Sequence, residues 1–168
     1  RRSSDLIFSS SATVYGAPQY LPYDEAHPTM PMNTYGRTKL QAELILLDLA
    51  KSDLNLSIIS LRYFNPVGAH ESGLLGEAPN GLPNNLMPYI CQVASGKLSH
   101  LNIYGDDYET QDGTGERDFI HVMDLAEGHA AALNWVMEKT GYEVVNLGTG
   151  IPMSVYGLVS AFESANKC

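Results

Sequence analysis

The chain has 168 residues, of which 44% are hydrophobic, so it is long enough to form one domain with a sizeable core. Lys and Arg total 10 against 19 Asp and Glu, and the formal net charge of −9 excludes a broad basic surface for nucleic acid. No stretch approaches the roughly 20 apolar residues of a membrane span, so no membrane partner is expected.

The first third of the chain predicts a strand, a long loop, a helix and a second strand. Residues 6–10 read as a short buried strand, and the Pro- and Tyr-rich loop that runs to residue 32 has a length typical of functional loops. Asn33 is a suitable N-cap for a helix over residues 34–52. The exposed side of that helix is expected to carry Gln41, Glu43, Asp48 and Lys51. The β-rich run over 54–63 predicts the second strand.

The rest of the chain continues the alternation. A Gly- and Pro-rich loop over 65–83 precedes a helix expected at 86–95 and a brief strand at 101–104. Residues 119–122 form too short a run to classify, and they are followed by a helix at 124–139, a strand at 143–147 and a helix at 154–166. Strands and helices that alternate in units of roughly 30 residues are typical of an α/β fold with a parallel sheet.

The sharpest local motif is Tyr35-Gly36-Arg37-Thr38-Lys39, at the start of the first predicted helix. Residues four apart on a helix share one face, so the phenol and the ammonium can share a site. A phenol is a poor base at neutral pH, and a neighbouring ammonium stabilises its phenolate form. Residues 35, 39, 42, 46 and 49 form one stripe, which we expect to face inward. The structural alternative to a catalytic pair is that Tyr35 and Lys39 are ordinary residues on a solvent-exposed helix.

A second motif, Ser9-Ser10-Ser11-Ala12-Thr13-Val14-Tyr15-Gly16, directly follows the first predicted strand. The carboxyl edge of a parallel sheet is where α/β folds bind ligands, so these hydroxyl groups are candidates for a site. Backbone capping is the structural alternative for a Ser- and Thr-rich turn.

A strand that ends in a hydroxyl cluster and is followed by a YxxxK helix resembles the extended short-chain dehydrogenase/reductase family. Within it, four strings resemble the UDP-glucose (UDP-galactose) 4-epimerases: Ser11-Ala-Thr-Val-Tyr-Gly16, Arg62-Tyr-Phe-Asn-Pro66, Pro83-Asn-Asn-Leu-Met-Pro88 and Gly113-Thr-Gly-Glu-Arg-Asp-Phe-Ile-His-Val-Met-Asp124. The resemblance covers nearly the whole chain. It implies part of a Rossmann-like parallel sheet with helices on both faces, plus part of a smaller substrate-binding lobe, with both ends incomplete.

The resemblance also implies a reaction. Tyr35 would remove the proton of the sugar 4-hydroxyl while hydride passes to NAD, Lys39 would hold the nicotinamide ribose, and Ser11 would hydrogen-bond the 4-oxygen, with Thr13 as a helper. The 4-keto sugar would turn over and take the hydride back on its other face. UDP-galactose and UDP-glucose would thus interconvert without net redox change.

Further site residues follow from the same resemblance. Ser9, Ser10 and Tyr63 would join Tyr35 and Lys39 in binding the cofactor. The residues that would contact the UDP-sugar are Ser11, Ala12, Thr13, Phe64, Asn65, Asn84, Asn85, Leu86, Asn102, Ile103, Tyr104 and Arg117. Among them, Arg117 would bind the diphosphate. Residues 102–104 would form a strand beside uracil. Each has a structural alternative: Asn84 and Asn85 as helix caps, Tyr63 as a core aromatic, and Arg117 paired with Glu116 or Asp118.

The sequence contains no GxGxxG loop, although the family binds the NAD pyrophosphate on one. We therefore expect a central piece of the enzyme, with residues 1–63 as the C-terminal half of the Rossmann core and 64–168 as mixed core and substrate-lobe segments. This piece is expected to be inactive alone. By likeness, the whole enzyme is expected to be a homodimer.

Other readings stay open. A UDP-glucuronate 4-epimerase or decarboxylase shares the Tyr/Lys pair, and a non-catalytic relative would share the fold, whereas a 4,6-dehydratase is disfavoured because Ser11-Ala12-Thr13 lacks an acidic pair. The five histidines form no HExxH motif or compact ligand cluster, so no metal is expected. Cys91 and Cys168 form neither a disulfide framework nor a CxxC motif, so a cytoplasmic location is expected.

Overall fold

The computed structural model describes residues 5–166, and its main sheet consists of three parallel strands. They are β1 (Asp5–Ser9), β2 (Ser57–Tyr63) and β5 (Gly141–Leu147), in the order β1-β2-β5. The central strand β2 is buried along residues 57–62. A parallel sheet that is covered on both faces buries its central strand in this way. The predicted α/β class is confirmed.

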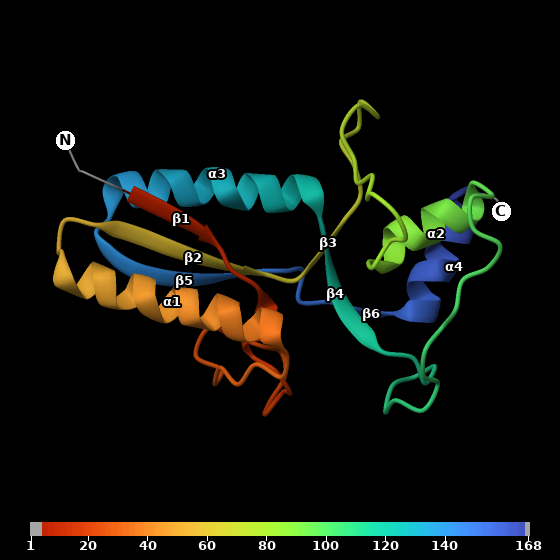
Figure 1. Cartoon of the computed structure of the whole chain (residues 1–168), viewed down its shortest axis with the longest axis horizontal. Coiled ribbons are helices and arrows are strands. Elements are labelled where there is room, and N and C mark those ends of the chain that lie inside the picture. The colour runs from red at the N-terminus through yellow and green to blue at the C-terminus, as the bar shows by residue number, and fades with distance from the viewer. Residues whose placement is uncertain (1–4, 167–168) are drawn as a thin grey trace.

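Helices α1 (Thr34–Ser52) and α3 (Val122–Glu138) cover opposite faces of this sheet (Figure 1). The alternation of side chains along β2 divides the core between them. Ile59 and Leu61 pack with Ala132 and Val136 on the α3 side, whereas Ile58 packs with Ala50 and Leu56 on the α1 side. Because successive strand residues point to opposite faces, Ser60 and Arg62 face α1 together with Ile58.

Helix α1 begins and ends where the sequence predicts. The Asn33 side chain accepts a hydrogen bond from the Gly36 N–H at 2.7 Å, which satisfies one free donor of the first turn. Gly36 is buried, and a Cβ added there would lie 2.6 Å from the Thr13 carbonyl oxygen. The absence of a side chain at Gly36 therefore lets α1 lie directly against the short 3₁₀ helix η1 (Ala12–Val14).

The buried face of α1 is centred elsewhere than expected. Gly36, Glu43 and Ala50 are its buried residues, whereas 46% of Leu49 is exposed. The stripe through residues 35, 39, 42, 46 and 49 thus lies at the edge of the packing face. The prediction that Glu43 lies on the exposed side is wrong, because a buried arginine on β2 pairs with its carboxylate.

A smaller lobe contains the remaining elements (Figure 1). Its sheet has the order β3-β4-β6, in which β3 (Asn65–Val67) is parallel and β6 (Pro152–Ser154) antiparallel to β4 (Glu116–His121). Helices α2 (Leu86–Ala94) and α4 (Val155–Asn166) belong to this lobe. The chain enters it from β2 into β3 through Phe64, whose N–H donates to the Leu147 carbonyl oxygen at 3.0 Å.

Three short strands were not predicted, and one predicted strand is absent. Residues 101–104 form no strand, so the prediction of a strand there, including Asn102, Ile103 and Tyr104, is wrong. Their alternating apolar pattern pairs with neither sheet of the described residues. Among the helices of residues 5–166, none combines the length and the hydropathy that crossing a membrane requires.

Candidate active site

The Tyr35 and Lys39 side chains lie on the same face of α1, as their spacing predicts. The Lys39 Nζ is 5.5 Å from the centre of the Tyr35 ring and 5.1 Å from the centre of the Phe8 ring on β1. It also donates a hydrogen bond of 2.8 Å to the Ser9 carbonyl oxygen, at the carboxyl end of β1. The ammonium is thereby fixed beside the ring of the phenol.

Tyr35 itself is open to solvent on one side. The exposed fraction of the residue is 51%, and its hydroxyl has no hydrogen-bond partner within the part of the chain that the structure describes. A group that exchanges protons with a ligand must be reachable by it. The position of Tyr35 at the end of α1, beside a fixed ammonium, meets that requirement.

Ser11 lies at the start of η1 with its side chain almost completely buried. Its Oγ accepts two hydrogen bonds, at 3.2 Å from the Thr13 N–H and at 3.0 Å from the Thr13 Oγ1. A serine hydroxyl has one proton and two acceptor lone pairs. Because both lone pairs are used, the Ser11 hydroxyl is left to act as a donor, which suits contact with a ligand oxygen.

The neighbouring serines have different surroundings. Ser10 is completely buried and its hydroxyl donates to Glu43, away from the open side of the sheet edge. The Ser9 Oγ lies 3.1 Å from the Nε2 of His129 on α3, whose Nδ1 faces the Leu125 carbonyl oxygen at 2.8 Å. That carbonyl requires a donor, so the Nδ1 carries the proton and the Nε2 accepts from Ser9.

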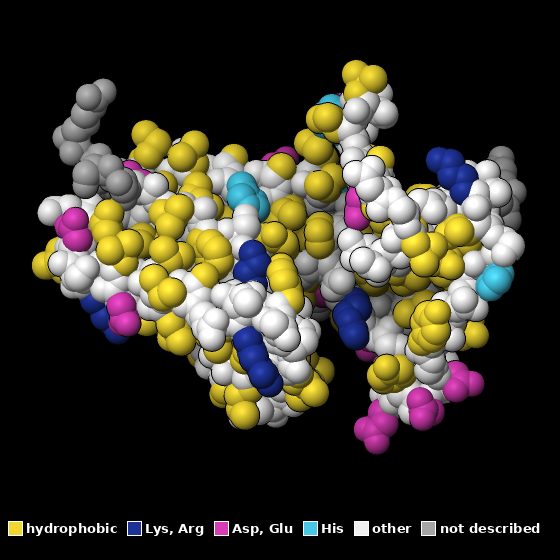
Figure 2. Space-filling model, viewed as in Figure 1, with side chains coloured by type: hydrophobic (Ala, Val, Ile, Leu, Met, Phe, Trp, Pro, Cys, Tyr) yellow, Lys and Arg dark blue, Asp and Glu magenta, His cyan; other side chains and the backbone are white. Residues whose placement is uncertain are grey.

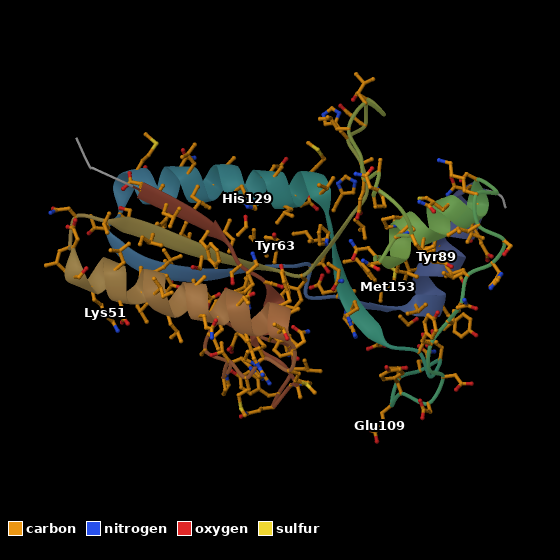
Figure 3. All side chains as sticks on the ribbon, in the orientation of Figure 1. Lys51, Tyr63, Tyr89, Glu109, His129 and Met153 are labelled. Atoms are coloured by element: carbon orange, nitrogen blue, oxygen red, sulfur yellow. The ribbon has the colours of Figure 1, made fainter. Side chains whose placement is uncertain are left out.

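Tyr63, at the carboxyl end of β2, is half-buried, and its ring centre is 6.2 Å from that of His129. Figure 3 shows Tyr63 at the end of the sheet that faces the smaller lobe, with Tyr89 and Met153 across from it. The predicted cofactor residues from β1, α1 and β2 therefore meet at one edge of the parallel sheet. Sequence reasoning missed His129, whose contact with Ser9 joins residues 120 apart.

The smaller lobe carries a cavity of about 270 Å³. Six predicted substrate residues line it: Asn65, Asn84, Asn85, Leu86, Tyr104 and Arg117. Phe64, Asn102 and Ile103 are not among the lining residues, while Tyr108 and Phe119 line the cavity without having been predicted. In the space-filling view, the surface is hollowed between the two lobes (Figure 2).

The cavity wall offers an anion site at the start of α2. Asn85 is the N-cap residue but makes no side-chain capping bond, and its side-chain amide donates to Glu77 at 3.0 Å. The structural alternative for Asn85, a side chain that caps the helix, is therefore not found. The N–H groups of the first turn, at Leu86 and Met87, belong to residues that line the cavity, and free helix N–H groups favour an anion.

Arg117 adds a cation to the same cavity. Its guanidinium donates to the Glu116 carbonyl oxygen at 2.6 Å, and it forms no salt bridge with Glu116 or Asp118. The Asp118 carboxylate instead accepts from Thr149 and Gly150. Burial raises the pKa of Tyr23, and the charge of Arg117 partly opposes that rise.

No group of three or more His, Cys, Asp and Glu side chains within residues 5–166 is arranged to hold a metal ion. The buried His27 uses both ring nitrogens inside the protein, at 3.0 Å from the Gln19 N–H and at 2.8 Å from the Pro28 carbonyl oxygen. The His121 Nδ1 caps α3 by accepting from the Met123 N–H. These two histidines have structural roles.

Comparison with known proteins places this architecture in a family. Residues 1–148 match the NAD dependent epimerase/dehydratase family. The UDP-glucose 4-epimerases of Homo sapiens and Bacillus subtilis are each 56% identical to the chain over 96% of its length. The chain spans 47% and 48% of these two relatives, about half their length.

Solved structures agree with the sequence comparison. The UDP-glucose 4-epimerase of Bifidobacterium longum, in complex with NAD+ and UDP, is 54% identical and superimposes with a TM-score of 0.93 over 97% of this chain and 49% of that one. The UDP-glucose 4-epimerase of Stenotrophomonas maltophila, with bound NAD and a formylated UDP-arabinopyranose, gives 52% identity and a TM-score of 0.94 over 97% of this chain and 48% of that one. The chain therefore belongs to the NAD dependent epimerase/dehydratase family.

Proposed function

We propose that the full-length protein containing this chain interconverts UDP-galactose and UDP-glucose by transient oxidation at sugar C4, with tightly bound NAD. The observation that carries the proposal is the placement of Lys39, which lies against the Tyr35 ring and donates to the end of β1 beside Ser11. The 56% identity to UDP-glucose 4-epimerases supports this choice among the nucleotide-sugar reactions.

The roles of the three residues follow from their surroundings. Tyr35 starts as the phenolate that the Lys39 ammonium stabilises, takes the proton of the sugar 4-hydroxyl, holds it as a neutral phenol and later returns it. Ser11 donates its hydroxyl proton to the 4-oxygen, since both of its lone pairs are occupied by Thr13. No metal enters this scheme.

The residues at the sheet edge fit a nicotinamide cofactor. Lys39 keeps two of its three N–H donors after its bond to Ser9, and ribose hydroxyls accept such bonds. Tyr63 presents a half-buried ring at the same edge. NAD, when bound, supplies the hydride acceptor and donor for sugar C4. Ser9 and Ser10 stay predicted cofactor residues, the latter without a free side chain.

The UDP part of the substrate is assigned to the cavity in the smaller lobe. Arg117 and the first turn of α2 supply a cation and N–H donors for the diphosphate, while Tyr104, Tyr108 and Phe119 supply aromatic surface for the base. Asn65, at the start of β3, directly follows the β2 edge and adds an amide between the two parts.

The decisive experiment uses the purified full-length protein with UDP-galactose. We expect UDP-glucose to form and NADH not to accumulate, because the hydride returns to the same sugar. Parallel incubation with UDP-glucuronate separates this function from a glucuronate epimerase or decarboxylase. Conversion of the glucuronate alone, or of neither sugar, would contradict the proposal.

We also propose that the protein is a homodimer that pairs through α1, and that it is cytoplasmic. The exposed side of α1 carries Leu44, Ile45 and Leu49, whose exposed fractions are 52%, 68% and 46%. Sedimentation should show a dimer, and Ile45→Asp should weaken it. Leu74→Asp is the control and should leave the dimer intact, because Leu74 lies in a loop and is 86% exposed. A monomer before any substitution would contradict the pairing.

A further inference from the structure

A buried polar network joins three elements below the proposed catalytic residues. Arg62 on β2 donates to the Glu43 carboxylate on α1 through its Nε at 3.0 Å and its second terminal nitrogen at 2.6 Å. The Ser10 hydroxyl donates to the same carboxylate, and the Tyr15 hydroxyl accepts from Arg62 at 3.1 Å. Exposed fractions are 3% for Glu43, 6% for Arg62 and 0% for Ser10 and Tyr15.

The network extends to β5 and contains a charged guanidinium. Tyr15 donates to the Asn146 side chain at 2.6 Å on β5, and burial, opposed by Arg62 and Asn146, raises the pKa of Tyr15. Burial alone would lower the pKa of Arg62, but its hydrogen bonds with Glu43 and Tyr15 raise it, so the guanidinium stays charged. An ion pair in a protein interior costs desolvation energy, and apolar residues often pack there equally well. Its presence therefore calls for a reason beyond stability.

The network joins the segments that carry the proposed catalytic residues. Glu43 is one helical turn beyond Lys39 and two beyond Tyr35 on α1. Ser10 directly precedes Ser11 at the end of β1, and Arg62 precedes Tyr63 at the end of β2. A forked guanidinium held by both carboxylate oxygens limits both the rotation and the axial shift of α1 against the sheet. Apolar contacts fix an axial shift much less sharply.

We propose that Glu43 and Arg62 are positioning residues, which set Tyr35 and Lys39 on α1 against Ser11 on the β1 loop. Neither residue has a hydrogen bond to Tyr35, Lys39 or Ser11 among the described residues, so both act through the elements that carry those groups. The inference rests on the proposed function for its kinetic consequence. Its structural content, the register of α1, does not depend on turnover.

The test is Glu43→Gln in the full-length, NAD-loaded protein, with Asp48→Asn as the matched control. Both changes convert a carboxylate on α1 to an amide and remove an ion pair, but the Asp48–Lys51 pair is exposed. We expect kcat per bound NAD to fall about 10- to 100-fold in Glu43→Gln, because a displacement near 1 Å costs that much. KM for UDP-galactose should stay unchanged, and Asp48→Asn should match the parent.

A paired variant separates positioning from folding. Glu43→Leu with Arg62→Met removes both charges at similar volume, so it should fold even where the single variant fails. Its kcat should fall as well, and in a Tyr35→Phe background both changes should lower the residual rate less than they lower the parent rate, because part of the effect passes through Tyr35. Parent-like kcat in the paired variant, or an additive loss, would overturn the proposal.

Hydrogen exchange tests the positioning role without a measurement of activity. Amides of residues 34–40 and 9–13 should exchange faster in both the single and the paired variant, and unchanged exchange there would overturn the positioning role. A parent protein that does not convert UDP-galactose would instead count against the proposed function, and the positioning claim would then be decided by exchange alone.

Discussion

At the scale of single residues, the site combines one exposed phenol with partners that are fixed by the backbone. Lys39 is held by a main-chain carbonyl, and Ser11 is held by the Thr13 hydroxyl and N–H. Such fixed neighbours keep their positions when a ligand arrives, which limits the reorganisation that the reaction requires.

Tyr35→Phe in the full-length protein should lower kcat by about 10²- to 10⁴-fold, since it removes the group that exchanges the proton. The free energy of unfolding should change by no more than about 0.5 kcal/mol, because Tyr35 is half exposed. Tyr156→Phe, at a tyrosine with 47% exposure on α4, is the control and should keep full activity. Retained turnover in Tyr35→Phe would remove that residue from the role of base.

Arg117→Ala should raise the Kd for UDP about 10- to 100-fold, because a hydrogen bond to a charged group contributes about 1.5–3 kcal/mol. Calorimetric titration of the full-length protein with UDP measures the change. Arg37→Ala, at an exposed arginine that does not line the cavity, should leave the Kd unaltered. Equal affinity in both variants would show that the diphosphate does not bind at Arg117.

At the scale of elements, the contact between α1 and η1 and the turn before β4 decide the local geometry. Gly36 lets the first turn of α1 lie against the Thr13 backbone. In the smaller lobe, the Asp112 carboxylate accepts hydrogen bonds from Ser154, at the end of β6, and from the Thr114 N–H and hydroxyl. The Gly36–Thr13 and Asp112–Ser154 contacts join segments that are far apart in sequence.

Gly36→Ala should destabilise the protein by about 1–3 kcal/mol and lower kcat, because its Cβ would approach the Thr13 carbonyl oxygen to 2.6 Å and the Pro31 Cβ to 2.9 Å. Gly157→Ala on α4 is the control, since its neighbours there are side-chain atoms at 3.0 and 3.4 Å. Denaturant unfolding and steady-state kinetics measure both effects. An unaltered Gly36→Ala protein would mean that α1 and η1 are not in this close contact.

Asp112→Asn should weaken the dependence of stability on pH in the acid range. Hydrogen bonds from Ser154 and Thr114 hold the pKa of Asp112 below its ordinary value of about 4. The folded state therefore gains stability above the ordinary pKa and loses it as the pH falls through the lowered one. Tm measured from about pH 2 to pH 6 should rise less in Asp112→Asn than in Asp107→Asn, and equal slopes would contradict this.

At the scale of the whole molecule, two lobes meet at the carboxyl edge of the parallel sheet. Tyr35, Lys39 and Ser11 belong to the sheet lobe, and the cavity that Arg117 lines belongs to the smaller lobe. A substrate with a sugar at one end and a nucleotide at the other can bridge the two. The long loop from Tyr15 to Met32 contributes to this edge through Tyr23, whose ring centre is 6.2 Å from that of Phe64.

The 168-residue chain expressed by itself should show no epimerase turnover and should bind NAD weakly or not at all. Its sequence has no GxGxxG loop, and within residues 5–166 β1 pairs on one side only, with 39% of Leu6 exposed. Turnover and NAD fluorescence, compared with the full-length protein, test this expectation. Detectable turnover by the chain alone would overturn it.

The bounds of α1, the α/β class and the placement of Tyr35 and Lys39 on one helix face could be predicted from the sequence. Helix α1 has the predicted bounds, and the α/β class followed from the alternation of strands and helices, because capping residues and hydrophobic periodicity act over short distances. The Tyr35 and Lys39 pair could likewise be found from its spacing of one helical turn. Four separated motifs in order are sufficient to identify the family.

Only the tertiary structure decided which residues lie together across the fold. Glu43 was expected in solvent, yet it is buried, because its partner Arg62 is 19 residues away on another element. Residues 101–104 alternate like a strand but pair with no strand in the described part of the chain, and His129 meets Ser9 across 120 residues. The reason is physical: burial, ion pairing and strand pairing depend on partners that the packed chain supplies, and local sequence does not contain them.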